Sequence, residues 1–185
     1  VGVIGAAVWG VMKAKETVDT ANDTAEEYSN PMLSDNDRSA LGLVDGEQYL
    51  WEGGGPAAIA VLLDGAIPGT PTNFTSIDLY TDYAFAVAQD PSIPQRLDRY
   101  GWRVGAVGLP DPQQDDADAP TKVFTITDMN WGLLAQRVAE APALLNVENG
   151  EITYVSVSRD TFDDAAPVIA RIYVTGPRNS GYMVV

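Results

Sequence analysis

The chain has 185 residues, of which 45% are hydrophobic, and it carries a formal net charge of −15 with no cysteine and no histidine. This composition is typical of globular material and excludes disulfides, thiol chemistry, Cys/His zinc sites and any mechanism that relies on imidazole. Eleven basic residues against 26 acidic ones also disfavour binding to long stretches of nucleic acid, because phosphate contacts need clustered Lys and Arg.

The first segment is apolar, and residues 1–12 contain no charge. Twelve residues are too few to cross a bilayer, which takes about 20. The pattern then continues as helix through Lys13 and Lys15, so we predict that residues 1–28 hold the end of a transmembrane helix and its extension. Trp9 and the two lysines are expected at the membrane interface. The alternatives are a buried helix of a soluble protein and the remnant of a signal peptide.

Small residues recur every four positions in this segment, at Gly2, Ala6 and Gly10. Such a stripe lets a second membrane helix approach closely, so it is a candidate helix-packing interface. The two lysines favour a cytoplasmic domain under the positive-inside rule, whereas the acidic, lysine-poor composition of the rest favours an extracytoplasmic one. We expect a single-pass protein of the cell membrane with its folded domain outside the cytoplasm.

A turn-rich linker is predicted over residues 29–55, which ends in Gly53-Gly54-Gly55. Pro56 then suits the first turn of a helix that extends to Ile67. The glycines before a helix are compatible with an anion-binding turn, but no Lys-Ser/Thr follows, so they do not form a P-loop. A hinge or a simple turn is the favoured interpretation.

Alternating patterns after this helix predict antiparallel strands in SIDLYTD (76–82), YAFAVAQ (83–89) and RYGWRVGAVGL (99–109). Each strand places its aromatic residues on one face, and we expect most of them in the core. A polar, proline-bearing loop is predicted over 110–120, followed by a strand at 122–129. The aspartates of the loop offer oxygen ligands for Ca²⁺, but their spacing matches no EF-hand, which favours a solvated acidic loop.

A second helix is predicted over residues 130–145, with Asn130 as its N-cap. Further strands follow in EITYVSVS (151–158), PVIARIYVTG (167–176) and GYMVV (181–185). The order of a helix followed by alternating strands therefore occurs twice, over 56–129 and 130–185. The predicted fold class is α+β, with two tandem units that each combine a helix and an antiparallel sheet.

The two helix-to-hairpin blocks at 56–109 and 131–185 carry a resemblance of pattern. Tandem units of this kind are similar to the architecture of the β-lactamase inhibitor protein and of PepSY-like domains. They also resemble membrane-anchored proteins of high-GC Gram-positive, actinobacterial type. The resemblance implies the fold and membrane anchoring, and no binding residue is carried over from it.

Catalytic chemistry finds little support in the sequence. No S-x-x-K motif supplies a lysine base to a serine nucleophile, so carboxylates are the remaining candidates for catalysis. Arginine pairs, Arg99/Arg103 and Arg171/Arg178, suit either an acidic partner or ion pairs with neighbouring aspartates. Our candidate partner surface consists of Tyr80, Arg99, Trp102 and Arg103.

The function we predict is that of a non-catalytic, membrane-anchored accessory subunit. It would assemble or stabilise a larger membrane complex, such as a respiratory assembly, with membrane protein subunits as partners and residues 1–15 in the bilayer. It would need no cofactor and bind no nucleic acid. The first alternative is a tethered extracytoplasmic module that binds or inhibits a protein or ligand, and the second is an enzyme that uses carboxylates alone.

Overall fold

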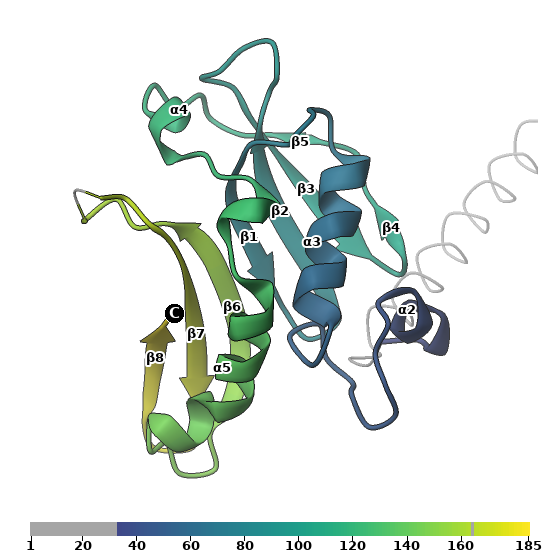
Figure 1. Ribbon diagram of the computed structural model, residues 1–185, viewed down its shortest axis with the longest axis vertical. Coiled ribbons are helices and arrows are strands. Elements are labelled where there is room, and N and C mark those ends of the chain that lie inside the picture. Colours follow the sequence, from purple (N-terminus) through teal and green to yellow (C-terminus); the bar gives the residue numbers. More distant parts are fainter. Residues whose placement is uncertain (1–32, 164) are drawn as a thin grey trace, which may run out of the picture. The chain divides into compact units, whose positions relative to one another are not determined.

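An antiparallel sheet organises the part of the chain that this computed structural model describes, residues 33–163 and 165–185 (Figure 1). Neighbouring strands follow the order β4-β3-β2-β1-β6-β7-β8, and the short strand β5 also pairs with β3. The strands are β1 (Phe74–Leu79), β2 (Tyr83–Gln89), β3 (Leu97–Arg103), β4 (Ala106–Val107), β5 (Asp111–Pro112), β6 (Glu151–Arg159), β7 (Val168–Thr175) and β8 (Ser180–Val184).

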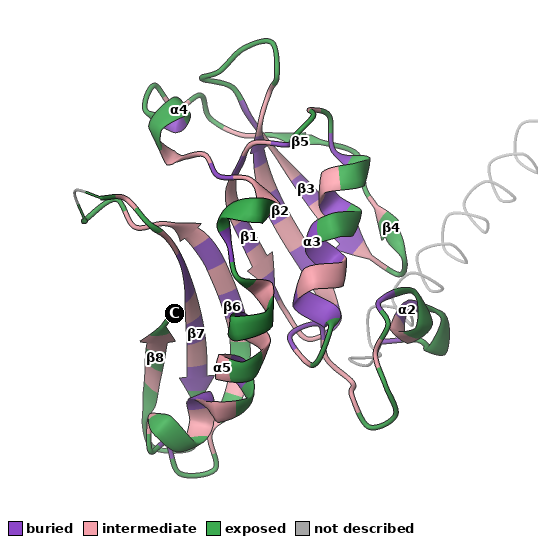
Figure 2. Ribbon diagram, viewed as in Figure 1, coloured by how far each residue is buried: buried purple, intermediate pink, exposed green. Residues whose placement is uncertain are grey.

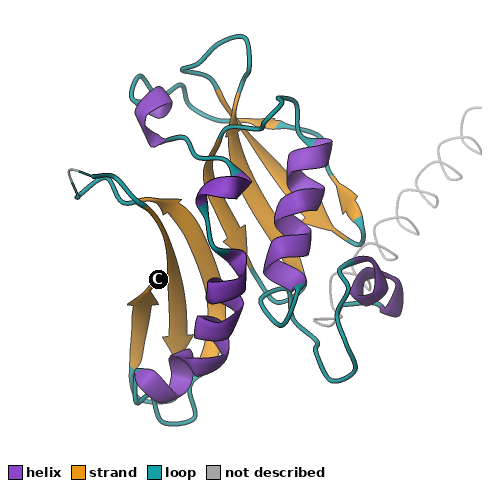
Figure 3. Cartoon of the chain, in the orientation of Figure 1, coloured by secondary structure: helices purple, strands orange, loops and turns teal. Residues whose placement is uncertain are grey.

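Two helices cover one face of this sheet, with α3 (Gly55–Ala66) in front of β1–β3 and α5 (Trp131–Leu144) in front of β6 and β7 (Figures 1 and 3). Pro56 lies in the first turn of α3, and the Asn130 side chain accepts a hydrogen bond from the Leu133 N–H at the start of α5. Both helix predictions are thereby confirmed within one residue at each end. The shorter helices are α2 (Asp35–Ala40), α4 (Ala119–Lys122) and the 3₁₀ turn η1 (Ile126–Asp128).

The order of one helix followed by three long strands occurs twice, as α3-β1-β2-β3 and as α5-β6-β7-β8. The two sets meet at the centre, where β1 pairs with β6 and Asp78 lies opposite Ser156. The predicted α+β class with antiparallel strands is confirmed, and one continuous sheet runs through both predicted units. Among the described residues, no helix is long and apolar enough to cross a membrane. The residues predicted as anchor and helix-packing interface, together with Trp9, Lys13 and Lys15, lie outside the described residues.

The core lies between the helices and the sheet, and β2 contributes alanines to it (Figure 2). Ala84, Ala86 and Ala88 are at most 1% exposed, whereas Tyr83 and Phe85 on the same strand are half-buried on the opposite face. The expectation that most strand aromatics belong to the core is therefore wrong for β2. Alanine leaves room for a helix to pack close to the strand, so the large rings are placed on the other face.

The segment predicted as a linker contains more structure than expected. Within its described part, α2 begins after a capping box between Ser34 and Asp37. Leu41, Leu50 and Trp51 are each buried in the main core. Residues 33–51 are therefore packed onto the folded unit, because three large apolar side chains in a turn-rich segment gain free energy by burial.

The segment 122–129 does not form the predicted strand. Phe124 makes only an isolated bridge to Phe74, and the chain then turns into η1, where the Asp128 carboxylate accepts from the Thr125 N–H and Oγ1–H. The predicted loop 110–120 likewise contains β5 and the start of α4. Alternation alone did not reveal the Thr125–Asp128 capping pattern that ends the extended backbone.

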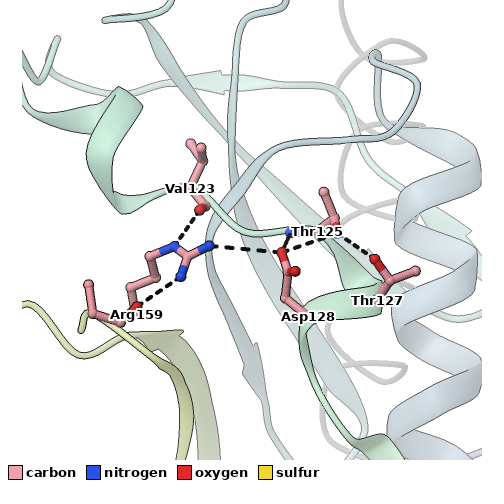
Figure 4. A network of polar contacts seen from close by, with 6 residues as sticks. Val123, Thr125, Thr127, Asp128 and Arg159 are labelled. Atoms are coloured by element: carbon pink, nitrogen blue, oxygen red, sulfur yellow. Dashed lines mark hydrogen bonds and ion pairs between the residues drawn. The ribbon is translucent and has the colours of Figure 1, made fainter.

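Arg159, the last residue of β6, fastens this segment to the sheet (Figure 4). Its Nε donates to the Val123 carbonyl at 2.6 Å and its Nη1 donates to the Ala166 carbonyl at 2.8 Å. Its Nη2 lies 3.9 Å from the Asp128 carboxylate. One side chain therefore links the end of β6 to the segments before α5 and before β7.

Candidate binding surface on the open face of the sheet

The face of the sheet opposite α3 and α5 carries a row of tyrosines that crosses the sheet from β8 through β7, β6 and the end of β1 to β2. We call this row the aromatic ladder, and its members in spatial order are Tyr182, Tyr173, Tyr154, Tyr80 and Tyr83. Neighbouring ring centroids are 5.6, 4.2, 5.6 and 4.5 Å apart in that order. No helix of the described residues covers this face (Figure 1).

Strand register produces the ladder. Tyr154 lies directly opposite Tyr173, and Tyr173 lies directly opposite Tyr182. Tyr80 follows the last residue of β1, and its N–H donates to the Tyr83 carbonyl across the β1–β2 turn. Because side chains on one face of paired strands stand about 5 Å apart, the register brings these rings into contact.

Phe85 extends the aromatic cluster from the ladder towards β3. Its ring meets the Tyr83 ring at 5.4 Å and 68°, an edge-to-face contact. Gly101 lies directly opposite Phe85 in the register, and a Cβ atom at Gly101 would stand only 3.2 Å from the Phe85 ring. The ring therefore occupies the space that a side chain at Gly101 would fill.

Arg99 lies on the outer side of Phe85, with its Cζ 3.6 Å from the ring centroid. This distance is that of a close cation–π contact. In the described part of the chain, no carboxylate lies within ion-pair distance of Arg99. A guanidinium that stacks on a ring keeps its in-plane N–H groups available for a carboxylate or carbonyl of a partner.

Arg103 occupies the corresponding position two residues along β3. Its Cζ lies 5.2 Å from the Tyr83 ring, and its Nη2 donates to the Asp82 carboxylate at 2.9 Å. Asp82 is 9% exposed, so this ion pair fixes the arginine beside the ladder. Tyr80, Arg99 and Arg103 thus lie together on one face, as the predicted partner surface requires.

Trp102 does not belong to this surface. It is 1% exposed and points into the core, because it alternates with Gly101 and Arg103 along β3. Its place in the predicted partner surface is therefore corrected. The period of two that puts both arginines on the open face necessarily puts the intervening tryptophan under the helices.

A polar row runs beside the aromatic ladder across the middle of the sheet. Asp78 lies opposite Phe85 on one side and Ser156 on the other, and Arg171 lies opposite Ser156. Burial raises the pKa of Asp78, while hydrogen bonds from the Ser156 and Ser76 hydroxyls and the charge of Arg99 act in the opposite direction. The hydrogen-bond partners of the Asp78 carboxylate are therefore hydroxyls of its own strand and of β6.

Burial among the rings also affects the tyrosine hydroxyls of the ladder. Desolvation, a hydrogen bond with Tyr173 and the nearby phenol and carboxylate groups raise the pKa of Tyr154 to about 12. Burial likewise raises the pKa of Tyr80. The phenols of Tyr154 and Tyr80 therefore stay neutral at physiological pH and offer both a donor and an acceptor.

The orientation of the rings determines what the ladder can bind. Tyr80 lies within 12° and 18° of its neighbours Tyr83 and Tyr154, and Tyr154 within 13° of Tyr173. Stacking of this kind covers ring faces with other rings. A hollow of about 490 Å³ beside Tyr154, Tyr173 and Tyr182 is also lined by Thr153, Thr175 and Ser180.

The other predicted features lie away from this face. In the acidic segment, Asp116 forms an ion pair with Lys122 at 2.7 Å, which lowers the pKa of the Asp116 carboxyl. Within the described ranges, no group of three or more acidic side chains is arranged to hold a metal ion. Glu52, before the glycine-rich turn, accepts from the Gln48 and Tyr49 N–H groups, which gives this turn a local structural role.

Sequence reasoning missed most of the ladder. It named Tyr80 and the two arginines of β3, but not Tyr83, Phe85, Tyr154 or Tyr182 as partners in one surface. The signal available in the sequence was the alternation along each strand. Tyr154 precedes Val155, and Tyr173 lies between Ile172 and Val174, and the structure buries these aliphatic neighbours on the other face. Comparison of the chain with protein-family models, curated proteins and solved structures found no match.

Proposed function

We propose that this chain is a non-catalytic protein-binding module whose open sheet face docks a partner protein. The observation that carries this proposal is the aromatic ladder with Phe85 and Arg99 beside it, on a face that the described helices leave uncovered. Aromatic residues and arginine are enriched at the centres of protein interfaces, where they supply much of the binding energy.

The geometry favours a protein over a carbohydrate. Sugars stack on exposed ring faces, whereas three of the four contacts in the ladder bring ring planes within 18° of each other and cover those faces. The ring edges and hydroxyls are left to contact a ligand. Such rigid, amphipathic groups make good contacts with a protein surface and lose little conformational entropy.

The charge of the surface indicates which partner residues it suits. The open face carries Arg99, Arg103 and Arg171, in a chain of net charge −15. Arg103 and Arg171 already lie near Asp82 and Asp160, at 2.9 and 3.8 Å, and Arg99 stacks on Phe85. A partner with an exposed carboxylate opposite Arg99, surrounded by apolar side chains, would match this arrangement.

The membrane-anchored accessory role remains a prediction, since it rests on residues 1–15, which lie outside the described part of the chain. A docking face of this kind serves either predicted role. In an accessory subunit it would contact another subunit of the complex, and in a tethered module it would capture a separate protein. The localisation outside the cytoplasm likewise stays a prediction.

Site-specific photo-crosslinking in the native host tests the proposal. A photoreactive phenylalanine analogue at Tyr83 reports on the open face, and the same analogue at Val61, which is 60% exposed on α3, is the matched control. We expect one discrete adduct from position 83 and none from position 61. The identified partner, once purified, should bind Phe85→Ala at least 10-fold more weakly than wild type and bind Val61→Ala unchanged.

Two results would overturn this function. Adducts that form equally from positions 61 and 83 would show that the open face is not the preferred contact. An affinity that survives both Phe85→Ala and Arg99→Glu would show that the partner binds elsewhere. Circular dichroism of each variant confirms that it is folded before affinities are compared.

A further inference from the structure

The two edges of the sheet differ. On one side, β3 is followed by the two-residue strands β4 and β5, and Pro112 interrupts pairing beyond them. On the other side, β8 is a five-residue strand at the end of the strand order (Figure 1). Short strands and proline are devices that prevent an edge from pairing with another chain, so the first edge is protected.

The second edge presents its backbone groups outward in a regular pattern. Val185 exchanges both backbone hydrogen bonds with Ala170, and Gly176 donates to Asn179 at the other end of the β7–β8 pair. Hydrogen-bonded pairs alternate along an antiparallel ladder, so Met183 and Gly181 also face β7. The N–H and C=O groups of the intervening residues point away from the sheet; these residues are Ser180, Tyr182 and Val184.

None of the usual protective features occurs along β8. Residues 180–185, SGYMVV, contain no charged side chain, no proline and no bulge in their pairing with β7. Tyr182 is 57% exposed and Val184 is 50% exposed. An uncharged, exposed edge strand with free backbone groups is a template for pairing with another strand.

We propose that β8 pairs with β8 of a second copy of this chain, antiparallel and about a two-fold axis at Tyr182. In this register Tyr182 lies opposite itself and Ser180 lies opposite Val184 of the second copy. The three outward-facing residues of each strand then satisfy one another's backbone groups completely. This inference does not depend on the proposed function, because it uses the edge of the sheet and its hydrogen bonds.

Side chains on both faces suit this register. On the open face, the two Tyr182 rings stand side by side, so the aromatic ladder continues from Tyr173 of one chain into the other. On the helix face, Gly181 lies opposite Met183 of the second copy. Since Gly181 has no side chain, Met183 can extend over it towards Leu145, the nearest side chain to Gly181.

The uncharged side chains of β8 permit pairing with a second copy of this acidic chain. Each chain carries −15, so most pairings between copies would bring acidic side chains together. The side chains of β8 carry no charge, so in this register they oppose no like charges directly. At about 0.15 M salt, charges farther than ~8 Å from the edge are largely screened. Isologous two-fold pairing is also the commonest way in which identical chains associate.

Disulfide trapping in this chain tests the register directly, because its 185 residues contain no cysteine. In Tyr182→Cys, the two Cα atoms at the two-fold axis would stand about 5.5 Å apart, within the range that a disulfide spans. We expect mild oxidation to convert most of this variant to a covalent dimer. In Val184→Cys the two equivalent positions would be roughly 14 Å apart, so this matched control should stay largely monomeric on a denaturing gel.

Oxidation of a mixture of two cysteine variants tests the register further. Ser180→Cys and Val184→Cys chains, oxidised together, should form mixed disulfides in preference to either self-linked dimer. Sedimentation velocity then measures the association without crosslinks: the natural chain should sediment as a dimer, and Val184→Pro as a monomer. Proline removes only an outward N–H at this position, so the β7–β8 pair and the far-UV spectrum should be preserved.

The proposal is overturned if Tyr182→Cys crosslinks no faster than Val184→Cys, or if the natural chain sediments as a monomer. It is also overturned if Val184→Pro remains a dimer, because association would then run through another part of the chain. Should Val184→Pro fail to fold, Tyr182→Lys is the second variant, which keeps the N–H and places two like charges directly opposite each other at the axis. Its monomeric state is expected, and an undiminished dimer contradicts the pairing.

Discussion

The two faces of the sheet are built from opposite choices of side chain. On β2, the face under α3 carries Ala84, Ala86 and Ala88, all at most 1% exposed, and the open face carries Tyr83 and Phe85. On β7 the covered face instead carries Ile172 and Val174. Small residues under a helix and large rings on the uncovered face are the reverse of a simple rule that large apolar residues lie in the core.

The size and polarity of a strand side chain therefore predict its burial only when it is known whether a helix packs on that face of the sheet. Alanine on β2 lets α3 pack close, and the volume between the layers is filled by Ile59, Leu63 and Trp102. The open-face rings bury part of their surface against each other, and the Tyr154 hydroxyl forms a hydrogen bond with Tyr173. A tyrosine ladder is therefore stable without a covering helix, and it leaves a face suited to a partner.

The strongest test of this comparison uses two neighbouring aromatic side chains on opposite faces. Trp102→Ala removes a fully buried ring and should lower the free energy of unfolding by about 3–5 kcal/mol. Phe85→Ala removes a half-buried ring from the open face and should cost only roughly 1–2 kcal/mol. Urea unfolding followed by far-UV circular dichroism measures both. Equal costs would show that the open face is part of the stabilising core.

A control variant, Trp102→Phe, separates the contribution of the volume of Trp102 to stability from that of its indole N–H. Among the described residues, the buried indole Nε1–H of Trp102 has no hydrogen-bond partner. Trp102→Phe therefore loses no hydrogen bond and should be much less costly than Trp102→Ala. A loss from Trp102→Phe as large as that from Trp102→Ala would show that the indole, rather than its volume, stabilises the core.

The sequence predicted the elements of this fold better than their faces. Period-two alternation located β2, β3, β6 and β7, and Asn130 marked the start of α5, because these signals are local. Alternation divides a strand into two faces, but it does not say which face a helix will cover. The alanine and aromatic sides of β2 were therefore distinguishable in the sequence, and their assignment to core and surface was not.

The candidate site shows the same limit. Arg99 and Arg103 were recognisable as one face of β3, but the predicted partner surface also included Trp102, which the same alternation places on the other face. The ladder depends on register across β6, β7 and β8, which pairs Tyr154 with Tyr173 and Tyr173 with Tyr182. Register between strands is set by the whole sheet, so Tyr80 and Tyr154, which are 74 positions apart in the sequence, gave no signal that they would meet.

Arg159 provides a second test of the covered face. It is a charged residue at the end of β6, on the side of the strand where Val155 and Val157 are buried. Arg159→Ala leaves the Val123 and Ala166 carbonyls without their donor, and should lower the free energy of unfolding by about 2–3 kcal/mol. Asp128→Asn changes only the 3.9 Å ion pair and keeps an acceptor for the Thr125 N–H, so it should cost less than about 1 kcal/mol. Chemical denaturation of both variants under one buffer compares them, and equal losses would assign the effect to the ion pair.

The smallest expected effect concerns the titration of the tyrosine hydroxyls on the open face. The ladder raises the pKa of Tyr154 from 10.0 in a free side chain to about 12. The folded chain therefore holds this proton where the unfolded chain has lost it, so the stabilisation is complete below about pH 10 and is lost as the pH rises towards 12. Absorbance at 295 nm should show one late-titrating phenol fewer in Tyr154→Phe than in the natural chain. The unfolding midpoint should fall less steeply above pH 10 in that variant. If the number of late-titrating phenols is unchanged in Tyr154→Phe, or if the two midpoints fall in parallel, the stacked environment of Tyr154 is contradicted.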